Sequence, residues 1–91
     1  MIVWHLSKPQ FILQSSALLA SIQEDDVVIL SGDAVYRAAS LSNSLKGNHY
    51  ALASDCAIRG IETDQLNTID MQKMADLIAT SEKFVTLWPI Q

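Results

Sequence analysis

The sequence is short of several residues and patterns that mark particular protein classes. Its 91 residues include a single cysteine, Cys56, so an internal disulfide is impossible and a cysteine-rich zinc site is excluded. Apolar runs such as Val27–Leu30 are far shorter than the roughly 20 residues that span a bilayer. The first residues lack the basic segment that opens a secretory signal. These absences predict a cytoplasmic protein with no membrane contact.

Basic side chains are also few. Six lysines and arginines stand against ten acidic residues, which gives a formal net charge of −4. Binding to phosphate backbones requires a basic patch that displaces counterions. The basic residues are instead dispersed along the chain, so we expect no direct binding of nucleic acid by this chain alone. They are Lys8, Arg37, Lys46, Arg59, Lys73 and Lys83.

Apolar residues, in contrast, are plentiful. They make up 49% of the chain and charged residues 18%, a composition that excludes disorder. The length predicts one domain over residues 1–91. A domain of this size buries only about 60–65% of the surface that its unfolded chain exposes. Some apolar surface therefore needs a neighbour, which predicts oligomerisation.

Short apolar runs alternate with longer amphipathic segments, and this pattern predicts strands separated by helices. Parallel pairing follows, because strands joined by helices form right-handed crossovers. We expect a small three-layer α/β/α sandwich with a mostly parallel sheet of four to five strands. Ile2–Leu6, Val27–Leu30 and Tyr50–Ala53 should be neighbouring core strands. The expected strands are Ile2–Leu6, Val27–Leu30, His49–Ala53, Leu66–Ile69 and Phe84–Trp88, with Pro89 ending the last.

Helices are expected in the segments between these strands. The first begins at a capping box of Ser7 and Gln10 and ends near Ile22. A second has apolar residues at helical spacing from Ala34 to Leu45, and Ser54 or Asp55 caps a short turn that ends at Gly60. Asp70 caps the last long helix, whose expected core face contains Met71, Met74, Ala75 and Ile78.

In open parallel sheets, sites form beyond the carboxyl ends of the strands. That edge is predicted to hold Ser7 and Lys8, then Ser31–Asp33, then Ser54–Cys56. The Ser31-Gly32-Asp33 turn lacks the glycine spacing of phosphate-binding loops, so we interpret Asp33 as a helix cap and expect no nucleotide cofactor.

The two histidines do not predict a metal site. His5 ends its strand and His49 begins its own, so we expect them to lie several residues apart along the strand direction. A zinc ion needs three or more ligands that converge on one point.

Cys56 is the one residue with nucleophilic promise. Its position at a helix start, with Arg59 nearby, favours a thiolate, whereas Asp55 opposes one. The alternative is that Cys56 packs as a small apolar side chain among Ala53, Ala57 and Ile58, as free cysteines commonly do.

Taken in order and spacing, several segments resemble the TusB/DsrH family over essentially the whole chain. They are His5-Leu6-Ser7, Glu24–Leu30, Gly32–Val35, Tyr50–Asp55, Arg59-Gly60-Ile61 and the last strand, which ends at Trp88.

The resemblance implies the DsrE/DsrF/DsrH fold and one subunit of a three-part complex, TusBCD or DsrEFH, that is a dimer of heterotrimers. Its sister subunits would be TusC/DsrF-like and TusD/DsrE-like chains. Such complexes pass persulfide sulfur between cysteines, from TusA towards TusE or a DsrC-like carrier, for 2-thiolation of the tRNA wobble uridine or for sulfur oxidation. The principal sulfur-carrying cysteine belongs to the TusD or DsrE subunit.

The chain departs from the family pattern at its cysteine. Some DsrH members carry a cysteine in the first helical segment, but Phe11–Ile22 contains none. Cys56 stands where family members often have an aliphatic residue, and its spacing to Arg59-Gly60 is too short for the active cysteine of the sister subunit. The resemblance therefore implies an accessory subunit of a sulfurtransferase complex, not catalytic by itself, of the TusB type. The alternatives are a DsrH-type subunit in intracellular sulfur oxidation, a sulfur carrier acting through Cys56, and an independent small-molecule-binding domain.

Overall fold

The structure is a computed structural model that describes residues 1–7, 21–41, 48–64 and 66–87. One sheet has the strand order β4-β3-β2-β1-β5, and each neighbouring pair is parallel. The predicted α/β fold with a parallel sheet is confirmed, and the three expected core strands are adjacent. The strands are β1 (Ile2–Leu6), β2 (Val27–Leu30), β3 (Asn48–Leu52), β4 (Thr68–Ile69) and β5 (Lys83–Leu87).

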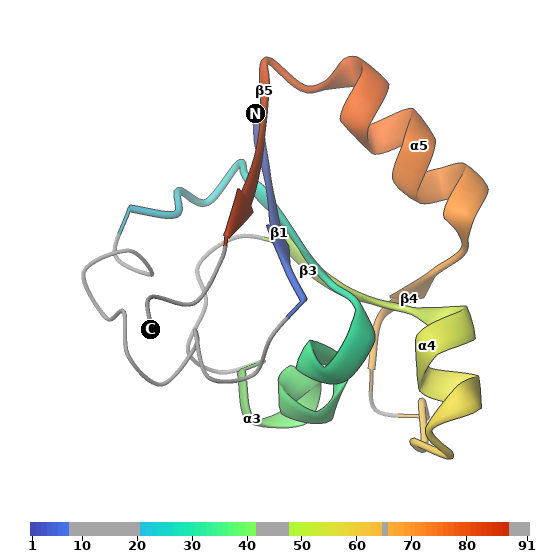
Figure 1. Ribbon diagram of the computed structural model, residues 1–91. Helices are drawn as coiled ribbons and strands as arrows, with labels where there is room; N and C mark the ends of the chain where they lie inside the picture. The colour runs from blue at the N-terminus through green and yellow to red at the C-terminus, as the bar shows by residue number, and fades with distance from the viewer. Residues whose placement is uncertain (8–20, 42–47, 65, 88–91) are drawn as a thin grey trace.

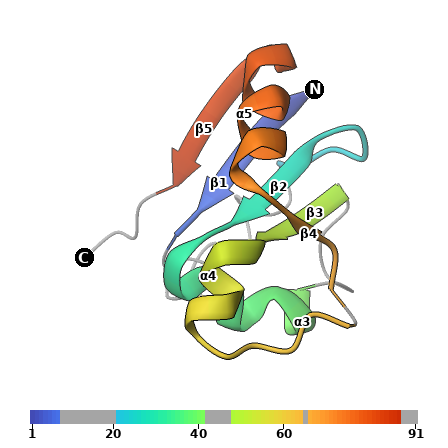
Figure 2. The ribbon, with the colours of Figure 1, turned by 90° about the vertical axis from the view of Figure 1, so that its right-hand side faces the viewer.

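Helices cover both faces of this sheet. The helix α5 (Met71–Thr80) lies on one face, and the 3-10 helix η1 (Gly32–Arg37) and α3 (Ala38–Leu41) lie on the other (Figure 1). The short helix α4 (Ala53–Ile58) continues directly from the end of β3. Figure 2 shows α5 in front of the sheet, with β5 along one edge.

Two apolar cores follow from this layering, because side chains alternate between the faces of each strand. All four residues of β2 are buried, as expected for a strand between two helix layers. The core beneath α5 contains Val3, Val27, Ile29, Leu52 and Ile69. The core on the opposite face contains Trp4, Leu6, Ile22, Val28, Leu30, Ala34, Val35, Ala38, Ala51 and Cys56.

At the amino end of the sheet, one buried carboxylate joins neighbouring strands. Asp26 accepts hydrogen bonds from the Ile2 amide at 2.9 Å and from the Trp4 indole at 3.0 Å. The Gln23 amide donates a third, also at 2.9 Å. Burial alone would raise the pKa of Asp26, but these hydrogen bonds and the nearby N-terminal ammonium outweigh it, so the pKa lies below its usual value. The charged form of Asp26 thus fastens β1 to the start of β2.

Several details of the helices differ from expectation. The segment after β2 begins as a 3-10 helix, in which the Ala34 amide donates to the Ser31 carbonyl, and becomes α-helical only at Ala38. Neither Ser54 nor Asp55 caps α4, which begins at Ala53 without a side-chain cap. Most of the expected first helix, the end of the expected second helix, Trp88 and Pro89 lie outside the described residues.

The helix α5 was predicted more closely. Asp70 caps it, accepting a hydrogen bond from the Lys73 amide at 2.7 Å. Its expected core face was wrong at Met71, whose side chain is 62% exposed, and at Ala75, which is also exposed. Met71 is the first residue of α5, directly after the Asp70 cap, and lies beside the edge strand β4, where the sheet ends. No helix among the described residues has the length and apolar character needed to cross a membrane.

Candidate functional site

The carboxyl edge of the sheet brings together the turns after β1, β2 and β3, as the sequence predicts. Asp55 in α4 accepts a hydrogen bond from the Gly32 amide at 2.8 Å, which joins the third turn to the second. Gly32 has a φ of +53°, and a Cβ atom there would lie 3.2 Å from the Ser7 carbonyl oxygen. Glycine is therefore favoured at this position both by the positive φ and by the close approach of the first turn.

Arg59 adds a second connection between the same turns. Its Nε and Nη2 atoms each lie 3.0 Å from Oδ1 of Asp33, and its Nη1 donates to the Asp55 carbonyl at 3.3 Å. Asp33 is therefore the ion-pair partner of Arg59, and the prediction that it caps a helix was wrong. A cap is not needed there because the 3-10 helix satisfies its first amides differently, with the Gly32 amide bound by Asp55.

Cys56 lies beneath this network. Its side chain is fully buried in the core on the η1 side, and its carbonyl accepts a hydrogen bond from the Ile61 amide at 3.0 Å. Burial raises the pKa of the Cys56 thiol; the charge of Asp55 raises it further, while Arg59 acts in the opposite direction. The geometry is that of a small apolar side chain in a core, since a reactive thiol must be exposed and ionise readily.

A histidine–serine pair lies at the same edge, on the α5 face. The His5 Nε2 and Ser31 Oγ atoms are 2.6 Å apart, and Thr86 Oγ1 lies 3.5 Å from His5 Nδ1. The His5 ring also stacks on Phe84, with centroids 5.9 Å apart. Burial lowers the pKa of His5, and the charge of Asp55 offsets this only in part. A neutral imidazole beside a hydroxyl could exchange a proton with it, but the next amide, Gly32, is already bound to Asp55 and cannot stabilise an oxyanion.

The two histidines do not meet. His5 is level with Ile29 and His49 with Val28, so they lie one residue apart along the strand direction, not several as predicted. The strand β2 separates them by about 10 Å, and the odd offset places them on opposite faces of the sheet. Within the described ranges, no three histidine, cysteine or acidic residues are grouped so that they could hold a metal ion.

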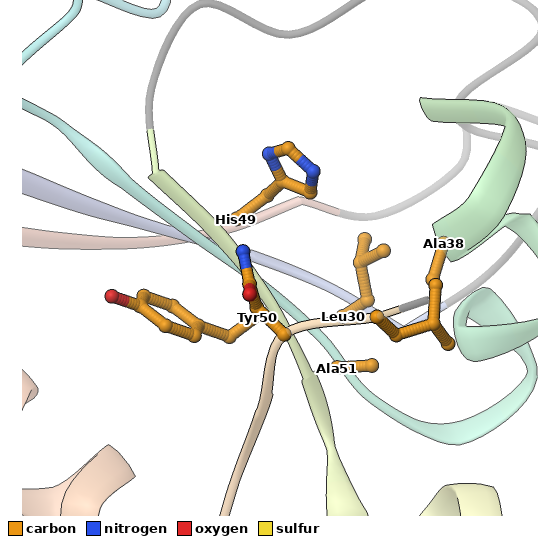
Figure 3. Close-up of a pocket in the computed structure, with 7 residues that line it drawn as sticks. Leu30, Ala38, His49, Tyr50 and Ala51 are labelled. Atoms are coloured by element: carbon orange, nitrogen blue, oxygen red, sulfur yellow. The ribbon is translucent and has the colours of Figure 1, made fainter. Parts of the chain in front are cut away.

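A cavity of about 250 Å³ lies between β3 and α3, on the face opposite α5 (Figure 3). It is smaller than the usual range for ligand pockets, about 300–1,000 Å³. Its apolar lining comes from Leu30, Ala38, Ala51 and Leu66, with Tyr50 and the polar residues His49 and Asn67 beside them. Neither Cys56 nor His5 lines it, so the cavity is separate from both side chains.

Comparison with known proteins identifies the family. The model of the family described as DsrH like protein matches residues 10–84, well over half of the chain. The chain belongs to the DsrH-like family. Comparison with curated proteins finds no match. DsrH-like proteins act in complexes with other sulfur-relay subunits, so the functional context of this DsrH-like chain is a sulfur-relay assembly.

The sequence indicated where the turns of this DsrH-like protein meet but not which side chains join them. Asp26 had no distinguishing signal, because it follows Glu24 and Asp25 in one acidic run. The His5–Ser31 pair depends on the β1–β2 register, which aligns Leu6 with Leu30 and so brings Ser31 beside the end of β1. The Asp33–Arg59 spacing of 26 residues likewise carries no local pattern.

Proposed function

We propose that this chain is a non-catalytic, accessory subunit of a cytoplasmic sulfur-relay complex of the TusBCD type, which acts in 2-thiolation of the tRNA wobble uridine. Its partners are TusC/DsrF-like and TusD/DsrE-like sister subunits in a dimer of heterotrimers. TusA and TusE or DsrC-like carriers deliver and receive the sulfur. Membership of the DsrH-like family supports the sulfur-relay context.

The state of Cys56 is the observation that carries this assignment. A relay cysteine must reach a second thiol, because persulfide sulfur moves by attack of one thiolate on the sulfur held by another. The Cys56 side chain is fully buried, and burial raises its pKa. Both properties oppose thiolate attack, so the sulfur-carrying cysteine belongs to a sister subunit.

Two further features of the sequence support this proposal. The first favours the TusB role over the sulfur-oxidising DsrH role, and the second argues against direct contact with RNA. Phe11–Ile22 lacks the cysteine that some DsrH members carry. The net charge of −4 disfavours direct contact with RNA, so tRNA is reached through the downstream carrier.

A genetic experiment distinguishes the two roles. Deletion of the gene should remove 2-thiouridine from tRNA, and the intact gene should restore it. Unchanged thiolation would favour the role in sulfur oxidation.

The test of the accessory role compares persulfide transfer by the reconstituted complex with Cys56 and with Cys56→Ser or Cys56→Ala. We expect transfer to stay within a few-fold in both variants when the amount of assembled complex is matched. Cys56→Ala keeps an apolar side chain and so controls for the cost of about 1–3 kcal/mol of burying an unpartnered hydroxyl. Loss of transfer by both variants in a fully assembled complex would show that Cys56 is a sulfur carrier.

A further inference from the structure

The two edges of the sheet differ in how much pairing surface they offer. The strand β4 forms one edge and is only two residues long, and Asp70 follows it at once as the cap of α5. The strand β5 forms the other edge and is five residues long, with the sequence Lys-Phe-Val-Thr-Leu. Figure 2 shows β5 beside β1 at the border of the sheet. A short edge resists pairing with another chain, whereas a long, mostly apolar one invites it.

The outward backbone groups of β5 can be assigned from the β1–β5 ladder. The Glu82 amide donates to the Met1 carbonyl at 3.0 Å, so Glu82 faces β1. Hydrogen-bonding groups alternate between the two sides of a strand, and Phe84 and Thr86 therefore also face β1. The amides and carbonyls of Lys83, Val85 and Leu87 point away from the sheet, and no described residue forms a hydrogen bond with them.

The side chains beside this edge are also incompletely covered. Phe84 is 40% exposed although its ring stacks on His5, and Val85 is only half-buried. Lys83 is the single charged residue of the strand. Among the described residues, this terminal lysine is the only protective device of the strand against pairing.

We propose that a second copy of this chain pairs with β5 in antiparallel fashion, about a two-fold axis at Val85. In this register the two Val85 residues exchange both of their backbone hydrogen bonds, and Lys83 of each copy pairs with Leu87 of the other. The six outward backbone groups of each strand, three amides and three carbonyls, then find partners on the other strand. The two five-stranded sheets become one continuous sheet.

Charge and side-chain pairing select this register. A two-fold axis at Lys83 would place two lysines directly opposite each other, which is unfavourable. An axis at Val85 instead separates the lysines to opposite ends of the ladder. It also places Phe84 opposite Thr86 of the second copy on one face, an aromatic and β-branched pair of the kind that stabilises sheets.

The pairing stands apart from the proposed function, because it requires only copies of this chain. Its test is a proline substitution on each side of the strand, with self-association of the full-length chain measured by sedimentation at a series of concentrations. Val85→Pro removes an outward amide and leaves the ladder to β1 intact, a placement that proline tolerates in edge strands. We expect a concentration-dependent dimer for the unmodified chain and a dissociation constant at least about tenfold higher for Val85→Pro, since two hydrogen bonds are lost.

Thr86→Pro is the matched control, because it removes an amide that faces β1. We expect it to lower the stability of the fold, whereas Val85→Pro retains the circular dichroism and unfolding midpoint of the monomer. A chain that stays monomeric at all concentrations, or a Val85→Pro variant that is folded and dimerises normally, would refute the proposal.

Amide hydrogen exchange of the unmodified chain provides a second measurement that needs no folded variant. The Val85 amide should become protected as the concentration rises, whereas the Phe84 and Thr86 amides should be protected at every concentration. Dimers in which the Val85 amide still exchanges as in the monomer would place the interface elsewhere. Protection of Val85 only after sister subunits are added would show that a sister subunit, not a second copy, occupies this edge.

Discussion

Two carboxylates at opposite ends of the sheet perform the same task in different surroundings. Asp26, at the amino end, is buried and receives hydrogen bonds from two amides and an indole. Asp55, at the carboxyl end, is 23% exposed and receives one amide hydrogen bond, with the Arg59 guanidinium 3.7 Å away. Asp26 fastens β1 to the start of β2, and Asp55 fastens α4 to the turn after β2.

The difference shows how burial changes what a carboxylate contributes to the fold. The interior strengthens hydrogen bonds to a charge, but it also makes an unsatisfied group costly. The Asp26 centre therefore fixes β1 and β2 in the core. The Asp55 centre joins turns at the edge where sites form in parallel sheets, and water reaches it. Four predictions test this difference between the two ends of the sheet.

The largest effect is expected for Asp26→Asn. An asparagine has nearly the same shape as an aspartate, but it replaces one carboxylate oxygen by an NH2 group. This group cannot accept the hydrogen bonds that the surrounding amides and the indole donate to the carboxylate. We expect the free energy of unfolding to fall by about 2–4 kcal/mol, measured by urea denaturation of dilute chain. Asp25→Asn is the matched control, since Asp25 is 77% exposed and should change stability by no more than about 0.5 kcal/mol. Equal losses of unfolding free energy in Asp26→Asn and Asp25→Asn would show that the burial of Asp26 does not add to its contribution.

The sequence predicted the architecture around these two centres but not the centres themselves. Apolar periodicity was sufficient to predict β1 and β2, because the buried residues of each strand lie in one short, mostly apolar run of the sequence. A local pattern was also sufficient to predict the Asp70 cap. Asp26 and Asp55 act across 22 to 24 residues. Their partners are fixed by strand register and by the close approach of Gly32 to Ser7, and neither is visible in a local window.

The second prediction concerns pH. The folded-state pKa of Asp26 is lowered, so its charged form favours the folded state. This contribution is fully present above the unfolded-state pKa, near 4, and is lost as the pH falls through the lower folded-state value. The stability difference between the unmodified chain and Asp26→Asn should therefore be constant from about pH 5 to pH 7 and shrink below about pH 4. Urea denaturation at pH 7, 5 and 3 measures it, and a difference that persists unchanged at pH 3 would contradict the assignment.

The third prediction moves to the carboxyl end. Asp55→Ala removes the acceptor of the Gly32 amide, and we expect a loss of about 1–2 kcal/mol, smaller than at Asp26 because water can replace the lost partner. The exposed Asp64 provides the control variant Asp64→Ala. Labelling of Cys56 by a thiol reagent should quicken by about tenfold in Asp55→Ala, because α4 opens more often and the charge that raises the pKa of Cys56 is gone. Unchanged labelling would mean that Asp55 does not hold α4 in place.

The smallest effect is expected for Arg59→Gln, and salt makes it diagnostic. The partner of Arg59, Asp33, has a side chain that is 57% exposed, so the ion pair contributes no more than about 1 kcal/mol at low salt. Screening weakens interactions between exposed charges as the Debye length shortens from about 10 Å at 0.1 M to about 3 Å at 1 M. The stability difference between the unmodified chain and Arg59→Gln should therefore nearly vanish at 1 M sodium chloride, while the difference for Asp26→Asn stays the same. If both differences shrink together, Asp26 is reached by solvent and the contrast between the two ends of the sheet fails. If neither difference shrinks, the protein keeps salt away from the Asp33–Arg59 pair, and solvent reaches the carboxyl edge of the sheet no more than it reaches Asp26.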